Sequence, residues 1–379
     1  MRDVAGRAKA LAPPGHRAAI RSLWPILAGV AVAAAMQYAS VQWVPPYFGK
    51  IVTDIGISII LAVSLNLVNG FTGQFSIGHA GFMAVGAYTA GAITYYGSFF
   101  LWGDAAFHGG IVSWTPPLAM PTAWLTGADL LFVAGCLAGG ITAAAAGYIV
   151  GLPSLRLKGD YLAIVTLGFG EIMRVLLLQT RAVMDDVEQI RSASPGQLAA
   201  SLGGSLGFSG LPYYTTIFWV YVAVAVMLIV AYRVKESTFG RAFLAIRENE
   251  IAAEAMGVPV TRYKVRSFVL AAFFAGIAGG LFAHEVGTSL RAEDMGFQKS
   301  FDVVIMVVLG GMGSISGVML AAIVLTVMPE ALRAFSEYRM VVYALLLIVM
   351  MILRPQGLFG VREIWEMGPF RRLLGGKTP

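Results

Sequence analysis

Ionisable side chains inside long apolar stretches are the first candidates for function in this sequence. Glu171 and Arg174 lie three residues apart within the apolar stretch Tyr161–Leu178, so on a helix they are one turn apart. The favoured interpretation is a structural pair in which each charge neutralises the other. The alternative is a polar element that lines a pathway or contacts a sister subunit, because charges at membrane depth are costly and mark functional sites.

The segment Gly70–Gly81 is the second candidate. It contains four glycines with a serine and a histidine, a composition that makes a poor continuous helix. Irregular backbone is tolerated at membrane depth only where protein buries it or a water-filled cavity adjoins it. Two interpretations therefore stay open. One is a transport pathway lined by Gly73, Ser76, Gly78 and His79, and the other is a cytoplasmic turn in which His79 is a packing residue.

Motif spacing argues against several other kinds of chemistry. The four histidines are scattered without metal-ligand spacing, so no metal site is expected. A phosphate loop requires G-x-x-x-x-G-K-[ST], and the nearest approach, Gly376-Lys377-Thr378, has Arg371 where the first glycine belongs. No H-E-x-x-H or G-x-S-x-G motif lies in a long apolar stretch. We expect neither an enzyme nor a cofactor bound by this chain.

The composition shows what must surround these residues. Of 379 residues, 58% are hydrophobic and only 13% are charged, whereas a soluble domain needs roughly a quarter. Lipid must therefore cover much of the surface. Forty-five glycines agree, because helices in lipid associate through small residues. Small residues recur four apart at Gly135/Gly139, Gly147/Gly151, Gly276/Gly280 and Gly313/Gly317, and the single cysteine, Cys136, is expected to be a packing residue.

A helix needs about 20 mostly apolar residues to cross the hydrocarbon core. Seven stretches qualify directly: Trp24–Val44, Ile51–Val68, Gly78–Tyr96, Asp129–Val150, Tyr161–Leu178, Tyr213–Tyr232 and Ser267–Val286. The stretch Phe301–Leu353 is broken at 310–314 and at 336–339, which divides it into three more. The sequence thus predicts an all-α polytopic membrane protein with about ten transmembrane helices.

The distribution of positive charge predicts the orientation. With ten spans and the N-terminus inside, 19 Lys and Arg residues fall in cytoplasmic segments and 6 outside, as the positive-inside rule requires. Nine spans would place the basic C-terminal residues outside. We therefore expect cytoplasmic tails at 1–22 and 355–379, and a transmembrane domain at 23–354. Because the net charge of +6 is explained by topology, nucleic acid is not an expected partner.

The segment 233–266 is the one substantial cytoplasmic connection, with seven basic and four acidic residues. Ser237 and Asn249 are placed to cap two short helices, and Gly257 to end the second. Phe239, Phe243 and Ile246 fall on one helix face. The segment is either a solvated connector or a docking element for a soluble partner.

Five motifs of this sequence resemble branched-chain amino-acid ABC permeases of the LivM type. They are GRAFLAIRENEIAAEAMG at 240–257, SLNLVNGFTGQFSIGHAGF at 64–82, LRLKGDY at 155–161, the stretch at 310–317 and LRPQGLFG at 353–360. The motifs cover roughly residues 50–360 in the family's order. The loop 98–128 and the N-terminal 20 residues match nothing in that pattern.

The resemblance implies an importer in the bacterial inner membrane with its work divided among subunits. This chain and a second homologous permease would form the pore, two cytoplasmic ATPases would bind ATP, and a periplasmic or extracellular binding protein would deliver the amino acid. The segment at 240–257 would seat in a groove on an ATPase. The residues expected to couple are Arg241, Arg247, Glu248, Asn249, Glu250, Glu254 and Gly257.

Two other functions remain compatible with the sequence. A related ABC permease could carry urea or amides, because selectivity is expected to reside largely in the binding protein. A secondary transporter driven by H⁺ or Na⁺ would use membrane carboxylates such as Glu171 or Asp302 as ion sites.

Overall fold

The computed structural model describes residues 16–105, 108, 126–154, 161–286 and 289–335, with single residues and short pieces between 338 and 363. The cytoplasmic tails expected at 1–22 and 355–379 lie largely outside these residues. Most of the loop 98–128 and of the motif 155–161 lies outside them as well.

Nine longer helices form a bundle within the described part of the chain. They are α2 (His16–Trp43), α3 (Pro46–Asn66), α4 (His79–Leu101), α5 (Gly127–Ser154), α6 (Tyr161–Leu178), α9 (Ile217–Glu236), α12 (Val260–Ala283), α13 (Phe297–Gly310) and α14 (Ile315–Ala331). Shorter elements connect them: the π-helix η1 (Leu67–Phe71), α7 (Val187–Ser192), α8 (Pro195–Ala200), η3 (Gly204–Leu206), β1 (Phe208–Ser209), α10 (Thr238–Glu248), α11 (Glu250–Ala255), β2 (Ser289–Leu290), η4 (Ala292–Met295) and η5 (Leu332–Phe335). The two strands form one antiparallel pair, with Phe208 opposite Leu290.

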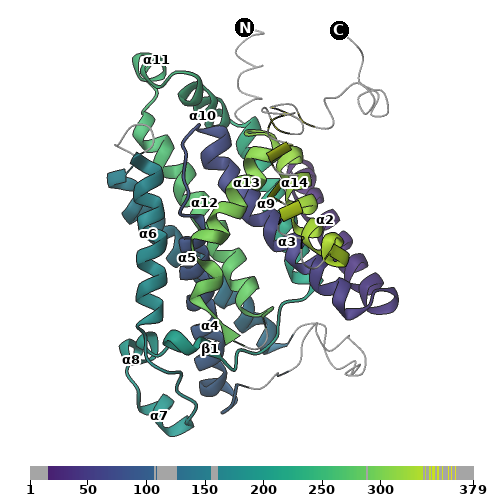
Figure 1. Ribbon diagram of the computed structural model, residues 1–379, viewed down its shortest axis with the longest axis vertical. Coiled ribbons are helices and arrows are strands. Elements are labelled where there is room, and N and C mark those ends of the chain that lie inside the picture. The colour runs from purple at the N-terminus through teal and green to yellow at the C-terminus, as the bar shows by residue number, and fades with distance from the viewer. Residues whose placement is uncertain are drawn as a thin grey trace.

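The bundle has two distinct ends (Figure 1). Helices α10 and α11 lie at one end, and α7, α8 and the β1–β2 pair lie at the other. Six described helices are long and apolar enough to cross a membrane: α2, α3 continued by η1, α5, α6, α9 and α12. The predicted all-α membrane protein is therefore confirmed. The count of ten spans stays a prediction, because the last of them lies mostly outside the described residues.

Glycines bring α4, α5 and α12 into close contact at the centre of the bundle. A Cβ atom added to Gly86 would lie 2.3 Å from Gly276 Cα, and one added to Gly139 would lie 2.5 Å from the Gly86 carbonyl oxygen. A side chain at any of the three would force the helices apart. Two of the predicted small-residue steps, at Gly139 and Gly276, thus form this crossing. Cys136 is buried beside it, as expected of a packing residue.

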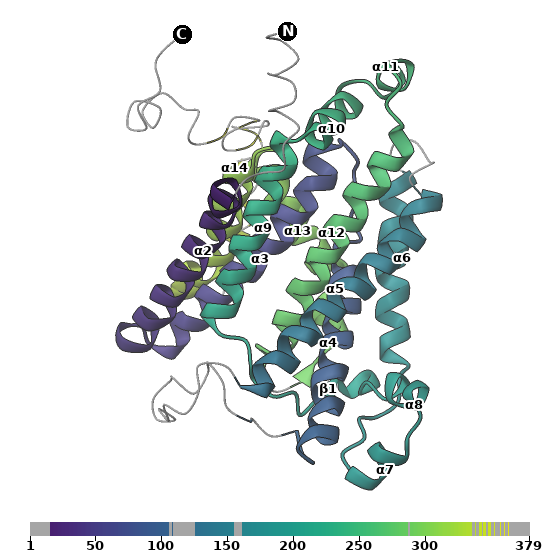
Figure 2. The same cartoon turned by 180° about the vertical axis from the view of Figure 1, so that it is seen from behind.

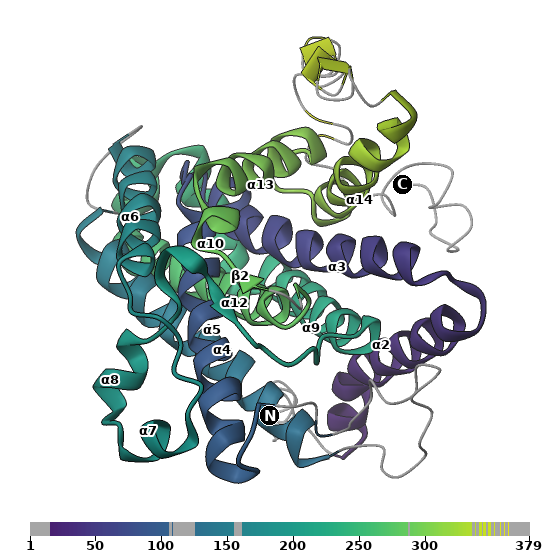
Figure 3. The same ribbon diagram turned by 60° about the horizontal axis from the view of Figure 1, so that its bottom comes forward.

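Burial separates the helices into inner and outer ones. Within their most apolar windows, 83% of the α3 residues are buried, against 11% for α2 and 22% for α6. The outer helices expose large apolar side chains, such as Trp24 on α2 and Ile172 on α6. Such surfaces suit contact with lipid, whereas α3 lies between α9 and α12 on one side and α13 and α14 on the other (Figure 3).

Several helix starts differ from the predicted spans for local reasons. α12 begins at Val260 rather than Ser267, because Pro259 fits the entry to a helix and the helix continues beyond the apolar stretch. α9 begins at Ile217 rather than Tyr213. The preceding Thr216 is extended, and the Thr215 hydroxyl donates a hydrogen bond to the Leu281 carbonyl oxygen at 2.6 Å.

Candidate coupling segment and transport pathway

The two helices expected in the cytoplasmic segment are present and begin at the expected caps. Ser237 Oγ accepts hydrogen bonds from the N–H groups of the second and third residues after it, at 3.1 and 3.4 Å. Asn249 Oδ1 accepts from Ala252 N at 3.0 Å. Gly257, at φ +84°, follows the second helix in the left-handed conformation that favours glycine. Local sequence signals therefore build this segment.

An apolar face holds the segment against the bundle. Phe243 and Ile246 are buried, as their shared helix face predicts. Phe239, the third member of that face, remains 42% exposed and packs between Tyr263 and the guanidinium of Arg266 instead. Burial of apolar side chains and a cation–π contact therefore both hold the segment against the bundle.

Glu250, one of the residues expected to couple, also holds the segment against the bundle. Its carboxylate accepts a hydrogen bond from Lys264 Nζ at 2.8 Å. The Lys264 side chain is only 7% exposed, so the pair fixes α11 to the second turn of α12. Glu250 is thus already engaged within the chain.

The outward surface of the segment is more apolar than its charge suggests. Figures 1 and 2 show α11 projecting beyond the neighbouring helices. Ile251 is 75% exposed there and Met256 is 84% exposed. Five of the expected coupling residues share this surface: Arg241, Glu248, Asn249, Glu254 and Gly257. We call this set, with Ile251 and Met256, the crest.

Arg247 points the other way, into the bundle. Its Nη1 donates hydrogen bonds to the carbonyl oxygens of Gly70, at 2.9 Å, and Met312, at 3.4 Å. One residue of α10 therefore holds two segments that lie more than two hundred positions apart in the chain. Arg247 thus connects α10 to both segments through hydrogen bonds within the chain.

Gly73 lies directly beneath this link. It has φ +69°, and a Cβ atom added to it would lie 3.0 Å from Arg247 Cγ. Both the backbone conformation and the close approach require glycine at this position. The expected pathway residue Gly73 and the expected coupling residue Arg247 thus belong to one site.

Asn66 ties the same two glycine-containing turns together. Its Nδ2 donates to the Ser314 carbonyl oxygen at 3.2 Å, and Gly313 N donates to its Oδ1 at 2.9 Å. The turns at 70–73 and 310–313 lie side by side at the end of the bundle that carries α10. Asn66 and its neighbour Asn69 were not identified from the sequence, although an amide in a long apolar stretch is a usable signal.

The chain between η1 and α4 is irregular and largely buried. Ser76 N donates to Asn69 Oδ1 at 3.1 Å, and Asn69 Nδ2 donates to the Ser76 carbonyl oxygen at 3.3 Å. The His79 ring is buried and its Nε2 lies 2.8 Å from Ser64 Oγ. A Cβ atom on Gly78 would lie 1.9 Å from the Thr166 carbonyl oxygen. These contacts support the irregular backbone, and the assignment of Gly73, Ser76, Gly78 and His79 to a transport pathway stays a prediction.

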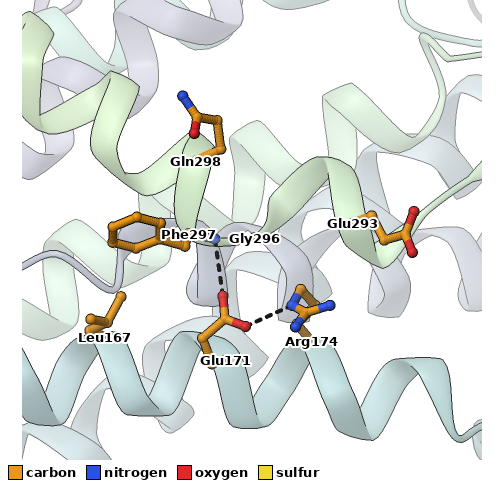
Figure 4. A pocket seen from close by; sticks show the side chains of 7 residues that line it. All are labelled: Leu167, Glu171, Arg174, Glu293, Gly296, Phe297 and Gln298. Atoms are coloured by element: carbon orange, nitrogen blue, oxygen red, sulfur yellow. Dashed lines mark hydrogen bonds and ion pairs between the residues drawn. The ribbon is translucent and has the colours of Figure 1, made fainter.

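Glu171 and Arg174 form the expected pair. Arg174 Nε donates to Glu171 Oε2 at 2.7 Å, and Glu171 Oε1 also accepts from Phe297 N at 3.1 Å (Figure 4). The carboxylate therefore satisfies an N–H group at the start of α13, which the sequence did not indicate. Both side chains line an open pocket rather than the interior of the bundle.

Glu363 was also missed, because no local pattern marks it. Its buried carboxylate forms an ion pair with Lys235 at the end of α9 and accepts hydrogen bonds from Ile315 N and Ser316 N, each at 3.0 Å. Burial alone raises the pKa of the Glu363 carboxyl, but the hydrogen bonds from Lys235, Ser316 and the two amides outweigh it and hold the pKa below its usual range. Glu363 thus caps α14 beside the coupling segment.

Among the described residues, no group of three or more His, Cys, Asp or Glu side chains could hold a metal ion. The chemistry that this arrangement supports is mechanical and electrostatic. An amphipathic segment on the surface is tied through Arg247 to the turns that connect membrane helices.

Comparison with known proteins identifies the family. The family model described as branched-chain amino acid transport system / permease component matches residues 47–352. This chain belongs to that family.

Individual relatives agree with the family model. LivM of Salmonella typhimurium, a high-affinity branched-chain amino acid transport system permease protein, is 39% identical over 324 residues, which cover 81% of this chain and 69% of that protein. LivM of Escherichia coli (strain K12) is 40% identical over 318 residues, covering 80% and 67%. LivH of Salmonella typhimurium is 24% identical over 308 residues, covering 80% and 92%. These relatives are transport permeases, not enzymes, and the present chain is a multi-pass membrane permease of the same family.

Proposed function

We propose that this chain is one of two pore-forming permeases in an ATP-driven importer of branched-chain amino acids in the bacterial inner membrane. The family match across 47–352 carries this proposal. The assembly would also contain two cytoplasmic ATPases, which bind the ATP, and an external substrate-binding protein. Similarity to both LivM and LivH supports a pair of homologous permeases.

The crest is the proposed ATPase docking surface. Ile251 and Met256 are large apolar side chains exposed on one short segment, and a partner protein that covers them would gain the free energy of removing this surface from water. Glu248 and Glu254 flank them with negative charge, which would orient a basic groove on the partner. An amphipathic helix in a groove is a recurring mode of protein recognition.

Arg247 is the proposed transmitter of ATPase motion. Movement of α10 would be carried by its guanidinium to the Gly70 and Met312 carbonyl groups. These groups belong to the turns that connect α3 to α4 and α13 to α14. A small displacement at the crest would therefore reach four membrane helices through one side chain.

Docking can be tested by charging the crest. The double variant Ile251→Asp/Met256→Asp should weaken co-purification of the ATPase subunits at least about 100-fold, since two buried anchors each contribute about 2 kcal/mol or more. Leu206→Asp is the matched control, because Leu206 is 80% exposed at the opposite end of the bundle. Unchanged ATPase recovery with the double variant would contradict the docking assignment.

A further inference from the structure

A pocket of about 510 Å³, lined by both charged and apolar side chains, lies between α6 and the start of α13, away from the coupling segment. Such a volume is within the range of about 300–1,000 Å³ that is typical of small-molecule sites. α6 contributes three residues at positions i, i+4 and i+7 on one face, and the chain around the start of α13 contributes four. The lining residues are Leu167, Glu171, Arg174, Glu293, Gly296, Phe297 and Gln298 (Figure 4).

This pocket cannot be exposed to lipid at low cost. Glu171 lies near the middle of α6 and Arg174 about one turn closer to its end, and their side chains are 36% and 30% exposed. A charged pair at that depth is costly in hydrocarbon. Ile172 on the same helix is 60% exposed and suits lipid. The pocket side of α6 must therefore face a water-filled path or another subunit.

The hydrogen-bonding capacity of Arg174 is only partly used. Its Nε donates to Glu171, whereas its two Nη groups make no hydrogen bond to any residue that the structure describes. A guanidinium edge with two such groups binds a carboxylate through two parallel hydrogen bonds. Both oxygens of Glu171 already accept a hydrogen bond from the chain itself, one from Arg174 and the other from Phe297 N.

We propose that this pocket is a transit site for a zwitterionic aliphatic α-amino acid. Arg174 binds the α-carboxylate, Glu293 binds the α-ammonium group, and Leu167 and Phe297 contact the aliphatic side chain. Glu171 is a positioning residue that holds Arg174 and the start of α13. The inference rests on the proposed function, because it assigns the amino-acid pathway to one face of the bundle.

Leucine uptake by the complete importer in proteoliposomes tests the role of Arg174. Arg174→Gln should lower uptake at least tenfold, while assembly and the ATP hydrolysis stimulated by loaded binding protein stay within about twofold. Arg181→Gln, an exposed arginine just beyond α6, is the matched control and should leave uptake unchanged. If Arg174 only neutralised Glu171, the double variant Glu171→Gln/Arg174→Gln would restore uptake, and this result would overturn the site.

A wild-type complex that imports no leucine would instead contradict the proposed function. If the wild type imports leucine and Arg174→Gln does so equally well, only the transit site fails. The proposed function and the transit site are therefore tested separately by the same set of measurements.

Cysteine labelling tests the location independently of transport. The chain has one cysteine, the buried Cys136, so Cys136→Ala provides a background without thiols. In the assembled importer, a charged membrane-impermeant thiol reagent should modify Leu167→Cys, and excess leucine should slow the reaction. Ile172→Cys, on the lipid-facing side, should stay unmodified. Equal inertness of both positions would place the pocket in lipid or in a closed interface and would overturn the proposal.

Discussion

The crest and the α6–α13 pocket differ from their surroundings in opposite ways. The crest exposes apolar side chains among charged ones, and the pocket exposes charged side chains on an apolar helix. The crest exposes Ile251 and Met256 at an end of the bundle where charged side chains are abundant. The pocket exposes Glu171 and Arg174 on the apolar helix α6. In both places the mismatch indicates a surface that another component covers: a soluble protein at the crest, and water, substrate or a second permease at the pocket.

The two regions differ in how they connect to the rest of the molecule. The crest is tied to the turns between helices through Arg247, whereas the pocket is lined by residues of α6, η4 and the start of α13. Force and substrate would therefore enter the permease at different sites. The bundle between them, close-packed at Gly86, Gly139 and Gly276, would transmit motion with little loss.

The largest expected effect tests whether the outer face of α6 contacts lipid. Ile172→Asp would place an unpaired charge there, at a cost of about 3 kcal/mol, which is roughly a 100-fold bias against the inserted helix. The yield of folded chain in the membrane should fall accordingly. Ile172→Phe is the control and should insert normally. Normal yield of Ile172→Asp would mean that both sides of α6 are covered, and the contrast with the pocket would fail.

A tenfold effect is expected at the link between crest and bundle. Hydrogen bonds from a charged donor contribute about 1.5–3 kcal/mol, so Arg247→Gln should reduce the leucine molecules imported per ATP hydrolysed roughly tenfold. ATPase recovery should not change, because Arg247 points away from the crest. Arg181→Gln, at an exposed arginine outside the crest, serves as the control. Loss of ATPase binding by Arg247→Gln would show that the residue belongs to the docking surface instead.

The smallest effect concerns the local order of the crest. Asn249→Ala removes the cap of α11 and should cost about 1 kcal/mol, since capping side chains typically contribute that amount. Amide hydrogen exchange within α11 should then accelerate about fivefold. Asn249→Asp, which preserves the acceptor, should exchange like the wild type. Equal exchange in all three chains would show that packing, not the cap, orders this helix.

The sequence predicts those parts of the site whose interactions are short in range. The caps at Ser237 and Asn249, the end at Gly257 and the pairing of Glu171 with Arg174 each involve residues within three or four positions, where helical spacing decides the contact. The positions of the spans can be predicted as well, because hydropathy is also a property of residues that are close in sequence. The family resemblance, read from ordered motifs, is confirmed by the family model and by the LivM relatives.

Contacts between distant segments could not be read from one sequence. Arg247 was expected on the docking surface, yet its donors reach Gly70 and Met312, because the tertiary arrangement of α10 sets its direction. Glu363 caps a helix almost fifty positions before it. No local pattern marks Ile251 and Met256 as exposed, and only the structure shows that they are.

Leucine uptake by the complete importer under two energy conditions tests the central claim most directly. Proteoliposomes would contain this chain with its partner permease and ATPases, and would receive leucine-loaded binding protein outside and ATP inside. We expect uptake that requires ATP and persists when ionophores collapse the H⁺ and Na⁺ gradients. Uptake that continues without ATP and stops with the ionophores would contradict it and would identify a secondary transporter.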